Sequence, residues 1–178
     1  MSTTYYLGKF AGLKVSARRT VLLAMVLLWA ALAVLAIWVI RLPVLGAILG
    51  SLAAALLHFV SEFWHHVGHA IAARMTGHPM TGVLFWGPLA TSIYPPKEKK
   101  LSAEIHVRRA LGGPLASLVL ASFAGLITLA LGQSSGTIWW VAFFLFLDNL
   151  LVFTLGALLP LGFNDGSTLW FWWKRRSS

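Results

Sequence analysis

Residues 62–75, EFWHHVGHAIAARM, place ionisable side chains inside a stretch that is otherwise apolar enough to lie in a membrane. On a helix that turns about 100° per residue, Glu62, His65 and His69 fall on one narrow face, and His66 borders it. A charged group that faces lipid costs roughly 3 kcal/mol, so these side chains must point at a partner inside the protein. A divalent metal ion is the simplest such partner, and His65 and His69 are its predicted ligands.

Two histidines leave a zinc coordination shell open, and the chain offers few further ligands. Cysteine is absent, which excludes thiolate ligands and disulfides. Among the remaining acids, Glu98 and Glu104 lie in a basic loop, and Asp148 lies well inside the last apolar stretch. Asp165 follows the end of that stretch, at about the depth of the histidines. We therefore expect Asp165 as the third ligand of a one-zinc site with an open position; the alternative is that Asp165 only forms a turn before Gly166.

Composition and hydropathy indicate an integral membrane protein. Of the 178 residues, 58% are hydrophobic and only 11% are charged, and the mean hydropathy is +0.80. Apolar stretches of about 20 residues or more, long enough to cross a bilayer, are predicted at 21–40, 43–75, 109–131 and 137–160. The first of these is expected to be retained as a helix, because it is too long for a signal peptide. We expect one membrane-embedded domain over residues 1–178.

The basic residues predict the orientation and the partners. The chain has 14 Lys and Arg against 5 Asp and Glu, a net charge of +9. These charges lie between the apolar stretches, which indicates an anionic lipid surface and not nucleic acid as their partner. With the N-terminus in the cytoplasm, every basic residue except Arg41 falls on the cytoplasmic side. Both termini, and the metal site, are therefore predicted to be cytoplasmic or close to that side.

Two further patterns concern the architecture. The segment 80–96, MTGVLFWGPLATSIYPP, carries β-favouring residues around Trp86, Gly87 and Pro88, which predicts a short re-entrant hairpin. The predicted fold class is thus an all-α integral membrane protein, with four transmembrane helices and a short re-entrant β-hairpin between the second and third. Small residues at every fourth position predict close helix packing; they are Gly46, Gly50 and Ala54, then Gly113, Ser117, Ala121 and Gly125.

Three motifs together resemble the site-2 protease family of intramembrane zinc metalloproteases. HHVGHA, at 65–70, stands where that family has HExGHA. GGPLAS, at 112–117, resembles its third-helix motif, and LLPLGFNDG, at 158–166, resembles its closing segment with Asp and Gly. The resemblance covers most of the chain. It implies that His65, His69 and Asp165 bind one zinc ion, and that the segment 81–94 presents an edge to an extended substrate.

Two positions depart from the family pattern. The glutamate expected after the first histidine is His66, and an asparagine expected three residues before Pro160 is Ala157. That glutamate normally acts as the general base, a function worth roughly 10² to 10⁴ in rate. His66 is a candidate substitute. Glu62, one turn before His65, is another: it could be a relocated base, a fourth ligand, or an acceptor that orients a histidine.

Three functions follow as hypotheses. The first is a metallopeptidase that cleaves transmembrane protein segments in the bilayer, with His66 or Glu62 as its base. The second is an inactive pseudoprotease that keeps zinc and binds membrane segments without cleaving them. The third is half of a di-iron site that also uses His58, but the other spans supply almost no ligands besides Asp148. Asp148 and Asn149 are interpreted as a polar pair that serves helix packing or a water path.

Overall fold

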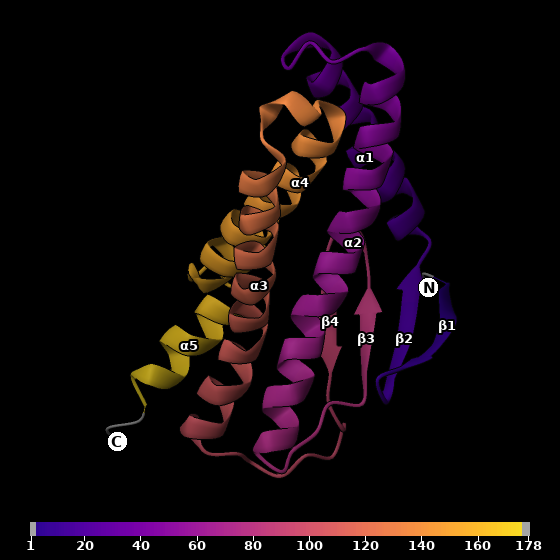
Figure 1. Cartoon of the computed structure of the whole chain (residues 1–178). Helices are drawn as coiled ribbons and strands as arrows, with labels where there is room; N and C mark the ends of the chain where they lie inside the picture. Colours follow the sequence, from indigo (N-terminus) through magenta and orange to yellow (C-terminus); the bar gives the residue numbers. More distant parts are fainter. Residues whose placement is uncertain (1–2, 176–178) are drawn as a thin grey trace.

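Long helices dominate the computed structural model, which describes residues 3–175 (Figure 1). Within these residues, four helical segments are long and apolar enough to cross a membrane. They are α1 (Thr20–Trp38), α2 (Val44–Met75), α3 (Ala103–Leu131), and α4 (Thr137–Leu147) with the π-helix η2 (Asp148–Gly156) that continues it. A short 3₁₀-helix, η1 (Gln133–Ser135), precedes α4, and α5 (Asp165–Trp173) packs against α3. The four predicted spans are confirmed, with small shifts at their ends.

The strands correct the predicted all-α class. Within the described residues, β1 (Thr4–Phe10), β2 (Leu13–Arg18), β3 (Gly82–Phe85) and β4 (Ala90–Ile93) form one sheet in the order β1-β2-β3-β4. The predicted hairpin over 81–94 is present as β3 and β4, and β3 pairs in parallel with β2. The N-terminal hairpin was not predicted from the sequence, although LKVSAR alternates in the way that a strand with one buried face requires.

The sheet lies along the C-terminal half of α2 (Figure 1). Leu13 and Val15 of β2, and Val83 of β3, are buried against Ala70 and Ala73 of α2. The apolar side chains of this shared core fix the sheet on the helix that carries the histidines. The arrangement leaves β4 at the edge of the sheet, beside the histidine-bearing turns of α2.

Small residues bring the helices into close contact, as their spacing predicts. A Cβ atom on Gly46 or Gly50 would come within about 2.6 Å of Thr137 at the start of α4. Gly68 of α2 and Gly112 of α3 face each other so closely that a Cβ on either would collide with the backbone of the other. The close approach of α2 and α3 matters for the site, because α2 carries the histidines and α3 contacts their rings.

A buried ion pair joins the centre of α2 to the start of the π-helix. Both carboxylate oxygens of Asp148 lie 3.1 Å from Nδ1 of His58, and Nε2 of His58 lies 2.9 Å from the carbonyl oxygen of Pro88. Both ring nitrogens of this buried histidine thus have a polar partner. Next to this pair, Nδ2 of Asn149 donates to Ser61 Oγ. Asp148 and Asn149 thus both contact side chains of α2.

Replacing His58 with alanine should lower the free energy of unfolding by about 3–5 kcal/mol, because it leaves the Asp148 carboxylate buried without a partner. The measurement is denaturant unfolding in detergent micelles, followed by tryptophan fluorescence. The matched control is His78→Ala, since the side chain of His78 is only half-buried. Equal stability of the two variants would show that the ion pair contributes nothing to the fold.

Candidate metal centre

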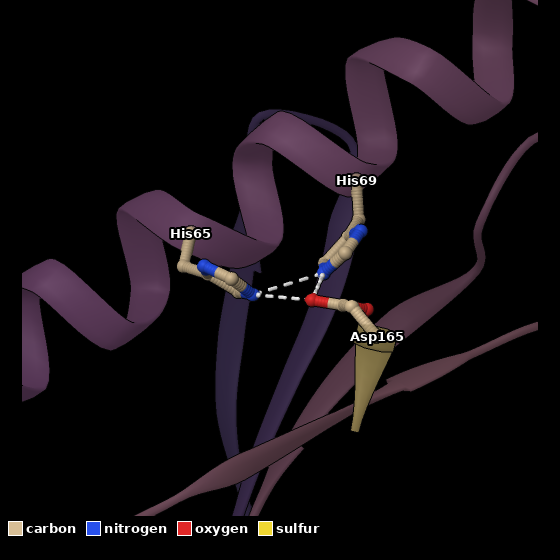
Figure 2. Close-up of side chains that lie close together, drawn as sticks. All are labelled: His65, His69 and Asp165. Carbon is tan, nitrogen blue, oxygen red and sulfur yellow. Dashed lines mark hydrogen bonds and ion pairs between the residues drawn. The ribbon is translucent and has the colours of Figure 1, made fainter. Parts of the chain in front are cut away.

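Three side chains from two helices converge at one point. Nε2 of His65 and Nε2 of His69 lie 3.0 Å apart, and Oδ2 of Asp165 lies 3.1 Å from the first and 3.3 Å from the second (Figure 2). Among the residues described, these three form a group of ligand-type side chains that could hold a metal ion. The sequence analysis expected these three residues, and the structure brings them together.

The spacing suits zinc. Zinc binds histidine nitrogen at about 2.0–2.1 Å and carboxylate oxygen at about 2.0–2.2 Å in a tetrahedral shell, so its ligand atoms lie about 3.3 Å from one another. The three separations between His65, His69 and Asp165 are close to this value. Three protein ligands leave a fourth position open, which is the arrangement of a catalytic zinc site.

Neighbouring groups hold the two imidazoles in place. Nδ1 of His69 lies 2.8 Å from the backbone carbonyl oxygen of Arg109, which favours the tautomer with its proton on Nδ1 and leaves Nε2 free to bind a metal. Nδ1 of His65 lies 3.0 Å from the hydroxyl of Ser117, which is fully buried. Sequence reasoning noted Ser117 only as a small residue for helix packing. The contact with Arg109 uses a backbone carbonyl, so the sequence carries no signal for it.

Asp165 reaches the histidines from the first turn of α5. Asn164 caps this helix: its side-chain oxygen accepts from the backbone N–H of Ser167, and its amide donates to the carbonyl oxygens of Gly156 and Leu159. The alternative expectation gave a turn-forming role to Asp165, and Asn164 fills that role instead. The carboxylate of Asp165 is thereby free to face the metal position.

The ionisation of Asp165 suits a metal ligand. Burial acts to raise the pKa of its carboxyl group, but the contacts with His65 and His69 outweigh burial and lower the pKa to about 2. The group is therefore a carboxylate at neutral pH, which is the form that binds zinc.

Gly113 of α3 keeps the metal position open. A Cβ atom on Gly113 would collide with Nε2 of His65 and Nε2 of His69, the atoms predicted to bind zinc. We expect Gly113→Ala to weaken zinc binding by at least about tenfold, since it displaces both rings. Chelator competition measures the affinity, with the exposed Leu115 replaced by alanine as the control on the same helix. An unchanged affinity in Gly113→Ala would contradict this view of the site.

Glu62 and His66, the predicted catalytic residues, lie beside the three ligands and contact β4. Oε1 of Glu62 accepts a hydrogen bond from the backbone N–H of Ala90 and lies 3.4 Å from Nε2 of His66. Nδ1 of His66 lies 2.9 Å from the hydroxyl of Ser92. The three roles considered for Glu62 stay predictions; its printed hydrogen bond is the one from the backbone of Ala90. Ser92 was not singled out by the sequence, because a single serine on a short strand carries no signal.

The three ligands open onto a cavity of about 810 Å³ between α2, β4, η2 and the start of α5. Its walls combine aromatic side chains, including Trp86 and Phe153, with the polar groups of the site. At the Tyr94 end, both terminal nitrogens of Arg109 contact Glu98, at 2.9 and 2.5 Å, and this contact lowers the pKa of Glu98. A cavity of this size accommodates several residues of an extended peptide.

No model of a known protein family matches the sequence, and no protein of curated function does. One solved structure is similar: the site-2 protease from Methanocaldococcus jannaschii, with a TM-score of 0.62 and 17% sequence identity. The alignment covers 94% of this chain and 70% of that protein. The two proteins share a fold. This shared fold and the four long apolar helices of the described residues are those of a multi-pass membrane protein.

Proposed function

We propose that the protein is a zinc-dependent intramembrane metallopeptidase that hydrolyses peptide bonds of transmembrane segments. The observation that carries the proposal is the convergence of His65, His69 and Asp165 at zinc-ligand spacing, on a fold shared with a site-2 protease. When bound, zinc would act as a Lewis acid that polarises the peptide carbonyl for hydrolysis of the peptide bond. The three ligands hold it, and Ser117 and the Arg109 carbonyl orient the two imidazoles.

The cavity and β4 suit an extended substrate. A transmembrane helix must unwind before its peptide bonds become accessible, and an unwound segment needs new partners for its backbone. The outer edge of β4 borders the cavity and offers such partners by strand addition. The substrate is thus a single-span membrane protein or peptide, and the bilayer is the surrounding partner. By the charge pattern, both termini face the cytoplasm and hydrolysis occurs near that side.

His66 and Glu62 are the residues placed to handle protons. Both line the cavity next to the ligands, and His66 follows the first ligand directly in sequence. In this proposal the imidazole of His66 accepts and returns the proton during hydrolysis, and Glu62 orients the ring.

The geometry of His66 favours a second candidate function, that of a zinc-binding pseudoprotease. Both ring nitrogens of His66 face partners other than the metal position: Nδ1 faces Ser92 and Nε2 faces Glu62. An imidazole held in this way makes a slow base. The protein would then bind and shield membrane segments without cleaving them.

The test is cleavage of a single-span reporter by the purified protein in phospholipid vesicles, together with metal analysis. The peptidase proposal expects one zinc per chain, cleavage that a chelator stops, and recovery when zinc is added. One zinc per chain without cleavage supports the pseudoprotease. Cleavage that continues at the same rate after the metal has been removed refutes the metallopeptidase proposal, and absence of zinc refutes both.

A further inference from the structure

The short helix α5, which carries Asp165, has one face toward the bundle and one that is exposed. Asp165 and Trp172 lie two turns apart on the inner face. The carboxylate contacts the two histidines, and the Trp172 indole stacks on the ring of His106, with centroids 4.2 Å apart and planes within 3°. The outer face exposes three large aromatic side chains, those of Trp170, Phe171 and Trp173.

Two cations extend the outer face of α5. Nζ of Lys174 lies 4.2 Å from the centroid of the Trp170 ring, and the guanidinium carbon of Arg175 lies 3.6 Å from that of Phe171. Exposed aromatic rings beside Lys and Arg are typical of segments that lie at the boundary between lipid headgroups and acyl chains. The outer face of α5 therefore fits the surface of a bilayer.

The loop before α3 and the start of α3 extend this positive surface. The stack of Trp172 on His106 places the end of α5 beside the start of α3, and Figure 1 shows both at one end of the bundle. Residues 95–109 and 170–175 together contain seven Lys and Arg and two acids. Each of these acids is paired with an arginine of α3. The surface carries a net positive charge, which favours anionic over zwitterionic headgroups.

The helix α5 depends on its partners. It has nine residues, and isolated helices shorter than about 12–15 residues are only marginally stable in water. Among the elements described, it makes its main contacts with α3. A surface that binds the outer face of α5 stabilises the helix, and with it the position of Asp165 in the first turn.

We infer that the outer face of α5 binds the anionic phospholipid headgroups of the bilayer surface, and that this contact strengthens zinc binding through Asp165. The inference rests on the zinc site of the proposed function and adds its regulation by lipid. Zinc and the headgroups bind opposite faces of one short helix, so each favours the docked helix that the other needs. Coupling of this kind is reciprocal and typically amounts to about 5–150-fold in affinity.

The test is the zinc affinity of the full chain in phosphatidylcholine vesicles with and without phosphatidylglycerol, measured by competition with a fluorescent chelator. We expect the wild type to bind zinc at least about fivefold more tightly when phosphatidylglycerol is present. Anionic vesicles also concentrate zinc near their surface, so the gain is compared between variants in the same vesicles.

A matched pair of double variants makes this comparison. Lys174→Gln with Arg175→Gln should lose most of the gain, because it removes the two cations of α5. Lys9→Gln with Lys14→Gln also removes two exposed cations, but from the N-terminal hairpin, and should keep the gain.

A second readout does not depend on zinc. The chain has no cysteine, so Trp170→Cys allows a fluorophore to be attached at this position alone. A lipid with a nitroxide near its headgroup should quench this fluorophore, and more strongly when phosphatidylglycerol is present.

The outcomes separate this inference from the proposed function. Equal zinc affinity of the wild type and the Lys174 and Arg175 double variant in phosphatidylglycerol vesicles overturns the inference and leaves the metallopeptidase standing. Quenching at position 170 that does not depend on phosphatidylglycerol overturns it as well. Absence of zinc from the wild type in both kinds of vesicle refutes the proposed function, and the coupling with it.

Discussion

Replacing His66 with glutamate is expected to raise zinc-dependent cleavage of a single-span reporter by about 10²- to 10⁴-fold, the contribution of a well-placed general base. The reason is geometric. Position 66 follows the first predicted zinc ligand and lines the cavity, but the imidazole there is held by Ser92 and Glu62. In the family that the sequence resembles, a glutamate is expected at this position as the general base. The measurement is the initial rate of cleavage in vesicles at matched protein and zinc content.

The matched control is His66→Gln, which has nearly the same size as glutamate but cannot accept the proton. A rate for His66→Glu no higher than that for His66→Gln, with one zinc bound to each, would contradict a peptidase mechanism at this site.

Asp165→Asn should weaken zinc binding by at least about 100-fold. Loss of residues that only orient metal ligands costs 10–100-fold, and a ligand itself should cost at least as much. The amide keeps the shape of the side chain, so the effect reports the lost charge and the lost coordinating oxygen. Zinc affinity is measured by competition with a fluorescent chelator in detergent micelles.

Asp148→Asn is the control for this prediction. Asp148 is another buried acid, but its carboxylate contacts His58 and not the metal position. It should keep its zinc, even if its stability falls. Equal loss of zinc in the two variants would mean that the affinity depends on the general integrity of the helices, and not on Asp165 as a ligand.

The sequence predicts the histidine pair and the spans well, because both depend on local periodicity. His65 and His69 share a helix face at a spacing of four residues, whatever the rest of the chain does. Asp165 could be chosen only by depth and by resemblance, since 100 residues separate it from His65. The structure brings it into place through Asn164, whose capping contacts span Gly156 to Ser167 and have no simple sequence signature.

The N-terminal strands and the fate of Glu62 were harder to predict. β2 pairs in parallel with β3, a partner more than 60 residues later in the chain, and no local pattern encodes such a pairing. The helical projection placed Glu62 near the metal-facing stripe. The position of β4 decided the outcome, because the backbone N–H of Ala90 draws the carboxylate of Glu62 to the strand. The partner of each polar side chain on this face of α2 thus depends on contacts between elements that are distant in the sequence.

The position of Asp165 on α5 has a consequence for biosynthesis. The two imidazoles leave the ribosome about 100 residues before the carboxylate that completes their coordination shell. A nascent chain already inserted in the bilayer by its first three helices therefore lacks a complete zinc site. For the proposed metallopeptidase, translation therefore completes the metal site only after the four helical spans have been made.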